Sequence, residues 1–392
     1  MRTDTMSDAM IPLSIPNLDG GNERQYLDEC LTSGFVSSVG PFVGRFEEEF
    51  ARFTGAPYGV ACASGTAAIH VALRVAGVES GDEVFVSDFT FVATVNPVAY
   101  LGARPVLVDA DDATWNMDPQ LVVEELDRRA ARGIRQPKAV LVAHILGLPA
   151  DIAPIAAACE RHGVVLVEDA AEALGAGYRS GPYAGRQTGT IGALGCFSFN
   201  GNKIITSGGG GMITTADAGM AKRAKHLTTQ AKLPGTEYLH DEIGYNYRLT
   251  NLAAAFAVAQ LERLNTFLAR KREIAERYDR AFSDLSGVTL PPRPEWSEPS
   301  MWLYSVLIDP AVAGLDRRAM LEQLETDGIQ SRPVWAPAHV MPFYADAPRL
   351  GGAVGDRLFA QGLSLPCSTN LTDTDQDRVI DAFRSALAIV EA

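Results

Sequence analysis

A lysine, a carboxylate and a candidate anion site follow three separate apolar runs of the chain. Lys203 lies in FSFNGNKIITSGGGG, between Ser198 and a run of four glycines, and Asp169 ends the run GVVLVED. A third run, YGVACAS, is followed by Gly65 and Thr66, which open a helical pattern. The first turn of a helix offers free backbone N–H groups and a positive dipole end to a phosphate. These are the groups that pyridoxal phosphate requires of a protein.

The chemistry gives each group a distinct task. A lysine holds the aldehyde of the cofactor as a Schiff base, and an aspartate keeps the ring nitrogen protonated so that the ring can act as an electron sink. The pKa of the lysine, ordinarily about 10.4, must fall so that part of the amine is neutral near pH 7. Taken alone, Asp169 or Thr66 could be an ordinary helix cap and Lys203 a solvated surface lysine. The glycine run does not predict a nucleotide-phosphate loop, because no helix follows it and no G-x-x-x-x-G-K-[ST] surrounds Lys203.

Apolar runs alternate with helical patterns, which predicts an α/β fold with a mostly parallel central sheet covered on both faces. Such sheets bind ligands at the carboxyl ends of their strands, which is where Lys203, Asp169 and the segment at 65–66 are expected to lie. The predicted strands are residues 58–64, 82–88, 104–110, 138–144, 163–169, 195–200 and 211–216, and the predicted crossover helices include 66–77, 118–133 and 151–163.

The chain of 392 residues exceeds the usual size of one domain. From 247 to 285 one long amphipathic helical stretch is predicted to link two domains. A strand-like run at 301–309, a helix at 316–328 and a terminal helix from about Asp373 follow, which predicts a smaller α+β C-terminal domain. We expect an N-terminal arm (1–19), a large cofactor-binding domain (20–262) and a small C-terminal domain (263–392).

Composition argues against several classes of protein. The chain carries 48 acidic and 34 basic residues, a formal net charge of -14, and no basic stripe suited to nucleic acid. No apolar run is long enough to span a bilayer and MRTDTMSDAM lacks the apolar core of a signal peptide, so we expect no membrane partner and a cytoplasmic protein. The five scattered cysteines are expected to be reduced packing residues, with no metal site.

The segments VEDAAEALGA, FSFNGNKIITSGGGGMI, DEIGYNYRLTNLAAAFAVAQLERL and RPVWAPAHVMP, in this order, resemble the DegT/DnrJ/EryC/StrS family of nucleotide-sugar aminotransferases over nearly the whole chain. IPLSIPNL, GFVSSVG and LTTQAK are most similar to the legionaminic-acid branch. The resemblance implies the pyridoxal phosphate (PLP)-dependent transferase fold type I, as in aspartate aminotransferase. It also implies transfer of an amino group from L-glutamate to C4 of a UDP- or GDP-linked 4-keto-6-deoxy-hexose, with the cofactor passing through its pyridoxamine form.

The resemblance also implies roles for residues around the cofactor. Lys203 matches the Schiff-base lysine that also moves the proton, and Asp169 matches the partner of the ring nitrogen. Phe89 matches the aromatic stacked on the ring, although alone it would be a core residue. Glu172 matches a polar position near the phenolic oxygen, or is a helix-surface acid. The expected phosphate contacts are Gly65, Thr66 and Ser198.

Three further positions concern the partner subunit and the substrate. Asn246 matches an asparagine that reaches the cofactor phosphate of a neighbouring subunit, which implies a homodimer with shared active sites. Arg248 and His339 match candidates for binding the nucleotide-sugar, with an intersubunit salt bridge and a structural histidine as the respective alternatives. Ala336 departs from the family, in which lysine or glutamine is common, so one substrate contact is missing.

Alternative functions share the same scaffold. A PLP-dependent deoxygenase replaces the lysine by histidine, so Lys203 favours amine transfer. Transfer to C3 of the sugar, or a PLP-binding regulatory protein without catalysis, remains open.

Overall fold

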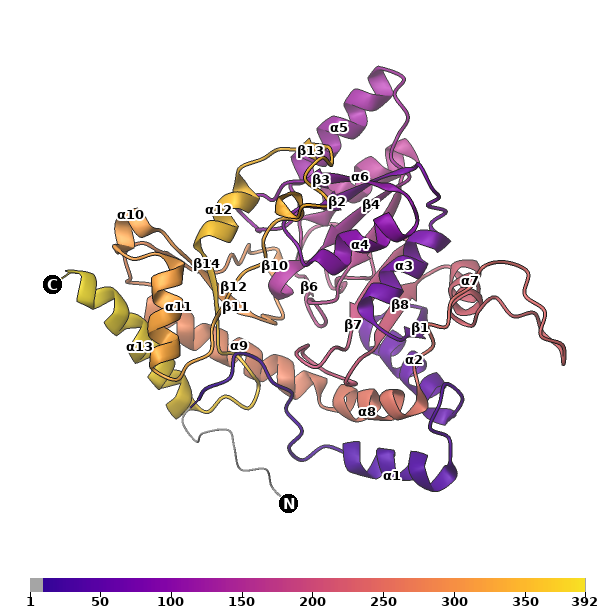
Figure 1. Ribbon diagram of the computed structural model, residues 1–392, viewed down its shortest axis with the longest axis horizontal. Coiled ribbons are helices and arrows are strands. Elements are labelled where there is room, and N and C mark those ends of the chain that lie inside the picture. The colour runs from indigo at the N-terminus through magenta and orange to yellow at the C-terminus, as the bar shows by residue number, and fades with distance from the viewer. Residues whose placement is uncertain (1–9, 392) are drawn as a thin grey trace.

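The computed structural model describes residues 10–391, and its largest element is an eight-stranded sheet (Figure 1). The strand order is β1-β8-β7-β5-β4-β2-β3-β13, in which β8 runs antiparallel to both of its neighbours and the other adjacent pairs are parallel. All seven predicted strands are present. The strands are β1 (Tyr58–Cys62), β2 (Glu83–Ser87), β3 (Arg104–Val108), β4 (Ala139–Ala143), β5 (Val165–Asp169), β7 (Leu194–Ser198), β8 (Gly211–Thr215) and β13 (Arg349–Leu350).

Helices cover both faces of this sheet because its strands are apolar on both faces. Val84 and Val86 of β2 pack into one core with α3, α4 and α7, whereas Phe85 between them packs into a second core with α5 and α6. This alternation with a period of two residues is what a strand buried on both sides requires. The helices are α3 (Gly65–Val75), α4 (Val92–Tyr100), α5 (Pro119–Ala131), α6 (Ile152–His162) and α7 (Ala218–Thr228).

The predicted long helix is two helices, α8 (Asn251–Glu262) and α9 (Leu264–Phe282), interrupted at Arg263. The prediction of one continuous helix was wrong because the two halves are buried by different partners. Helix α8 packs against α1 (Glu23–Ser33) and α2 (Pro41–Thr54), whereas α9 packs against α13 (Asp373–Glu391).

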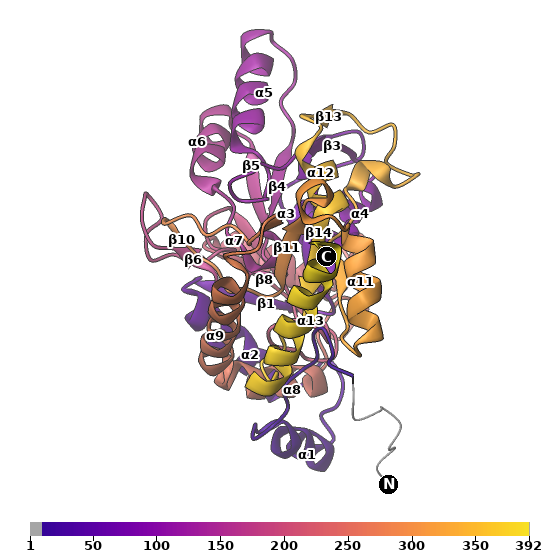
Figure 2. The ribbon, with the colours of Figure 1, turned by 90° about the vertical axis from the view of Figure 1, so that its left-hand side faces the viewer.

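The C-terminal part forms a four-stranded antiparallel sheet of order β12-β14-β11-β9. Figure 2 shows α13 lying between α9 and α11 on this part. One short strand of the C-terminal part, β13, does not join this sheet and pairs with β3 at the edge of the large sheet. The remaining elements are β6 (Gly177–Tyr178), β9 (Val288–Thr289), β10 (Ser297–Glu298), β11 (Tyr304–Ile308), α10 (Pro310–Ala313), α11 (Arg317–Thr326), β12 (Arg332–Pro333), α12 (Val354–Gln361) and β14 (Gly362–Leu365).

The described part of the predicted N-terminal arm lies against the C-terminal part. Ile11 forms an isolated bridge with Ile329, and Leu13 accepts a backbone hydrogen bond from Cys367. Residues 1–9 of the arm lie outside the described residues, and the division of the chain at 262/263 stays a prediction. All five cysteines are buried and free, as expected of packing residues. Between residues 10 and 391, no helix has the length and apolar character needed to cross a membrane.

Candidate active site

A cavity of about 250 Å³ lies at the carboxyl ends of β4, β5 and β7, beside the first turn of α3. The C-terminal part of the chain closes it with two tryptophans. The lining residues that could contact a cofactor or shape its site are Gly65, Thr66, Phe91, Thr94, His144, Asp169, Glu172, Ser198, Lys203, Trp302 and Trp335. Of the predicted cofactor residues, this set contains all except Phe89 and Asn246.

The first turn of α3 and the end of β7 approach each other closely. Ser64 caps the helix by accepting a hydrogen bond from the backbone N–H of Ala67 at 3.1 Å. A Cβ on Gly65 would lie 2.7 Å from Cβ of Ser198, and one on Gly211 would lie 2.3 Å from the Ser64 carbonyl oxygen. Glycine is therefore required at both positions, and the helix N-terminus stays open to an anion.

Asp169 is buried at the end of β5. Its Oδ2 accepts a hydrogen bond from the Thr94 hydroxyl at 2.7 Å, and its Oδ1 accepts one from the Ala171 backbone N–H at 3.0 Å. Burial raises the pKa of this carboxyl, and the positive charge of Lys203 opposes that shift. A cation brought against Asp169 would stabilise the ionised acid and would itself be stabilised.

Lys203 follows β7 in a turn, with 12% of its side chain exposed. Its Nζ lies 3.6 Å from Oε1 of Glu172 and 3.8 Å from the centre of the Trp302 ring. Burial lowers the pKa of the Lys203 ammonium, which is the direction a nucleophilic amine needs. Glu172 is buried, contrary to a helix-surface position, and burial raises its pKa to about 7. Its Oε2 accepts a hydrogen bond from the Leu146 backbone N–H at 2.9 Å.

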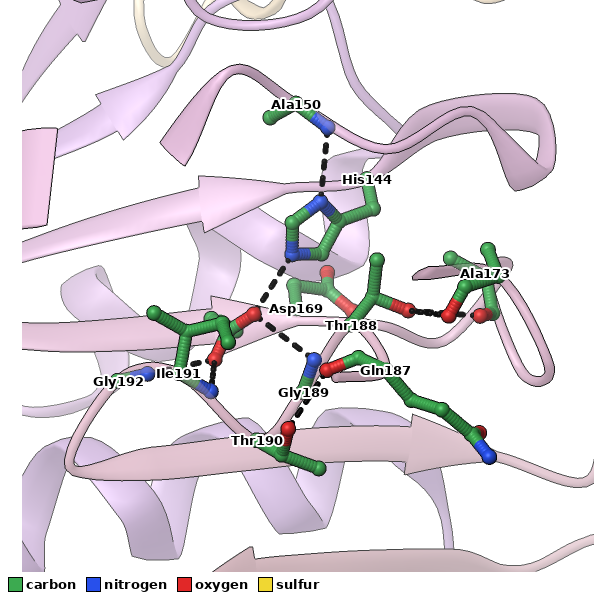
Figure 3. Close-up of polar contacts among 12 residues, drawn as sticks. His144, Ala150, Asp169, Ala173, Gln187, Thr188, Gly189, Thr190, Ile191 and Gly192 are labelled. Atoms are coloured by element: carbon green, nitrogen blue, oxygen red, sulfur yellow. Dashed lines mark hydrogen bonds and ion pairs between the residues drawn. The ribbon is translucent and has the colours of Figure 1, made fainter. Parts of the chain in front are cut away.

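Behind the cavity wall a second carboxylate, Glu168, holds two segments together. It is fully buried, and it accepts hydrogen bonds from the ring of His144 at 2.9 Å and from the backbone N–H groups of Gly189, Ile191 and Gly192 at 2.8, 2.6 and 2.6 Å. Figure 3 shows the contact between the Nδ1 of His144 and the Ala150 N–H, which donates to it at 3.0 Å. Because Nδ1 accepts, the ring donates to Glu168 through Nε2.

Sequence reasoning assigned no role to Glu168 beyond its place at a strand end. Its four donors come from loops after β4 and before β7, which no local pattern connects to it. The period of two along β5 was the available signal, because it turns Glu168 away from the face that carries Asp169.

Phe89, the predicted ring-stacking residue, does not line the cavity. Phe89 is 2% exposed and packs in the core, whereas Phe91, two residues later, is 49% exposed and lines the cavity. Phe89 lies two residues after the end of β2 and is buried, while Phe91 is the N-cap residue of α4. Phe91 contacts Trp335 edge to face at 6.3 Å between ring centres, and Trp335 stacks on Trp302 at 5.9 Å.

The three residues predicted for a partner subunit or substrate lie outside this cavity. Asn246 is exposed and accepts a hydrogen bond from Nη2 of Arg248 at 3.2 Å. His339 has its Nδ1 2.5 Å from Asp88 and its Nε2 3.0 Å from Asp356. This is the structural arrangement that was the alternative for His339, and we do not assign it a substrate.

The comparisons with known proteins agree with this geometry. Residues 17–384 match the model of the DegT/DnrJ/EryC1/StrS aminotransferase family. The chain belongs to this family. The predicted fold class, a type I α/β fold, and the prediction of an aminotransferase are thereby confirmed.

Three similar proteins illustrate the match. EpsN of Bacillus subtilis (strain 168), named as a pyridoxal phosphate-dependent aminotransferase, is 39% identical over 385 residues, which covers 97% of each chain. A GDP-perosamine synthase of Caulobacter vibrioides is 39% identical over 378 residues, covering 96% of this chain and 98% of that protein. The crystal structure of the aminotransferase TlmJ from Streptoalloteichus hindustanus superimposes with a TM-score of 0.87 at 33% identity, covering 98% of this chain and 100% of TlmJ.

Proposed function

We propose that this protein is a PLP-dependent aminotransferase that transfers the amino group of L-glutamate to C4 of a nucleotide-linked 4-keto-6-deoxy-hexose. The observation that carries the proposal is one cavity that brings together Lys203, Asp169 and the open N-terminus of α3. The similar proteins named above support the predicted enzyme class and the predicted cofactor.

The residues present fit the cofactor. The helix turn at Gly65 and Thr66, with Ser198 against it, would hold the phosphate, and the buried Asp169 has no cation at hydrogen-bonding distance among residues 10–391 and would hold the ring nitrogen. Lys203 would hold the aldehyde. When bound, PLP supplies a carrier for the amino group and a ring that accepts the electrons of the broken C–H bond.

The chain's own groups supply the proton transfers and the shape of the site. Once its amine is free, Lys203 carries a proton at Nζ between the reacting carbons, as its lowered pKa permits. We assign the ring face to Phe91 in place of Phe89, because only Phe91 lines the cavity. Glu172, with Oε1 3.6 Å from Nζ and a pKa of about 7, would lie near the phenolic oxygen of the bound cofactor.

We propose that the working unit is a homodimer in the cytoplasm. Asn246 and Arg248 do not line the cavity of their own chain, which fits a role at a site that a second copy brings to them. The Nε of Arg248 is buried without a hydrogen-bond partner within residues 10–391, which leaves a donor for a phosphate or a partner carboxylate.

Of the two nucleotides, GDP and UDP, we favour GDP as the one that carries the acceptor sugar. Relatives named GDP-perosamine synthase, at 37% and 39% identity, support a nucleotide-linked amino-sugar product. The legionaminic-acid branch stays a prediction, since it depends on short motifs alone. Ala336, half-buried beside Trp335, offers no side-chain hydrogen bond to a substrate.

The test is a complete turnover with defined sugars. Protein loaded with PLP is incubated with glutamate and with GDP- or UDP-linked 4-keto-6-deoxy sugars, and the product is identified by NMR. We expect 2-oxoglutarate and a 4-amino sugar. A 3-amino product, or no release of 2-oxoglutarate, contradicts the proposal. Borohydride should trap the cofactor on native protein and fail to do so on Lys203→Ala.

A further inference from the structure

The indole ring of Trp302 lies against the amine of Lys203. The Nζ is 3.8 Å from the ring centre, close enough for a cation–π interaction, and the tryptophan is 2% exposed. Glu172 is on another side of the amine, with Oε1 at 3.6 Å. The free amine therefore has two defined neighbours, one anionic and one aromatic.

Several independent contacts fix the ring in this position. The indole Nε1–H donates to the Asn202 carbonyl oxygen at 2.7 Å, which connects Trp302 to the residue before Lys203. The Trp302 carbonyl oxygen accepts a hydrogen bond from Nζ of the buried Lys271 at 2.8 Å. The second tryptophan, Trp335, stacks on its ring with 7° between the planes.

The backbone that carries Trp302 is strained. Met301 has φ of 54°, a left-handed conformation that a residue with a side chain rarely adopts. The segment is held against the loop after β4, where Ser300 N–H donates to the Gly147 carbonyl oxygen at 2.9 Å. A Cβ on Gly147 would lie 2.5 Å from the Trp302 nitrogen. Strain of this kind persists where the surroundings over-determine a functional geometry.

We propose that the Trp302 ring face is the resting place of the Lys203 ammonium whenever the lysine is not joined to the cofactor. The inference rests on the proposed function, in which Lys203 is released and re-attached in each cycle. A released lysine side chain can adopt many rotamers. The Trp302 ring face, 3.8 Å from Nζ, favours the rotamer that keeps Nζ in the cavity. Trp302 is thus a positioning residue that acts through Lys203.

The groups facing the amine set the direction of the effect. Burial lowers the pKa of Lys203, while Glu172 and Asp169 raise it. His144, which also lines the cavity, accepts a hydrogen bond from the Ala150 N–H at Nδ1. The ring adds to the stability of the ammonium form, so its removal should lower the pKa further.

The test measures the basicity of Lys203 directly. Full-length protein loaded with pyridoxamine 5'-phosphate is labelled with limiting acetic anhydride across pH, and the Lys203 peptide is quantified by mass spectrometry. We expect Trp302→Leu to shift the titration down by about one pH unit, a roughly tenfold gain in neutral amine at a given pH. Trp302→Phe should give a smaller shift in the same direction.

The matched control is Trp335→Leu, which removes a second ring of the same wall that does not contact Nζ, and it should shift the Lys203 titration by much less than Trp302→Leu because the other contacts of Trp302 remain. If Trp302→Leu does not fold, Trp302→Phe decides. An unchanged or raised titration in the Trp302 variants overturns the inference. Failure of the proposed function is distinguishable, because borohydride would then trap no cofactor on Lys203, while the Trp302-dependent shift would still be seen in cofactor-free protein.

Discussion

Replacing Glu168 by glutamine should destabilise the protein strongly, although the two side chains have nearly the same shape. Each carboxylate oxygen accepts two hydrogen bonds, from Ile191 and Gly192 at Oε1 and from Gly189 and His144 at Oε2. The amide nitrogen of glutamine would face two donors in either orientation. Each buried donor without an acceptor costs about 1–3 kcal/mol, so we expect a loss of about 4 kcal/mol.

A tautomer change in His144 does not rescue the variant. If the proton moved from Nε2 to Nδ1, the ring could accept from the new amide, but Nδ1–H would then oppose the Ala150 N–H that it now accepts from at 3.0 Å. Two buried N–H groups, of His144 and Ala150, would then face each other without an acceptor. The expected loss is a large part of the 5–15 kcal/mol that typically stabilises a folded protein.

The assay is urea unfolding of the cofactor-free protein, followed by circular dichroism. Glu160→Gln, the same chemical change at an exposed position of α6, is the control and should stay within about 0.5 kcal/mol of the native protein. A loss under about 1 kcal/mol for Glu168→Gln would refute the reasoning, since it would mean that the four donors find other acceptors.

Two further predictions concern side chains at the cavity. Phe91→Ala should weaken PLP binding roughly 3- to 10-fold in a spectroscopic titration, with little loss of stability. Phe89→Ala should instead lower the free energy of unfolding by about 3–5 kcal/mol, because Phe89 is buried. The reverse pattern would assign the ring face to Phe89. Burial raises the pKa of Glu172 from 4.5 to about 7, so the folded state gains stability from the proton below pH 4.5 and loses it as pH rises through 7. Relative to native cofactor-free protein, Glu172→Gln should therefore become more stable between pH 5 and 7, by about 3 kcal/mol at most, and parallel stability profiles would contradict this.

Sequence reasoning located the strands and the cofactor residues that adjoin them because both depend on local patterns. Lys203, Asp169 and Gly65 each follow an apolar run, and parallel strands bring their carboxyl ends to one edge. The choice between Phe89 and Phe91 could not be made locally, because two aromatics follow one strand end and only the path of the chain into α4 decides which one faces the cavity.

Contacts between distant segments could not be predicted in this way. Trp302 reaches Lys203 from a turn 99 positions later, and its placement depends on Lys271 and the loop at Gly147. The break at Arg263 likewise reflects which neighbours bury α8 and α9, not a helix-breaking residue. Such features depend on tertiary packing, which overrides local propensity.

The pairing of β13 with β3 bears on how the chain is made. Residues Arg349–Leu350 complete the border of the large sheet, so during synthesis β3 waits for more than 240 residues with its outer N–H and C=O groups unpaired. An uncovered strand of this kind is a template for association with other nascent chains. A strand that is made late in synthesis thus covers the edge of a sheet whose other strands are made much earlier.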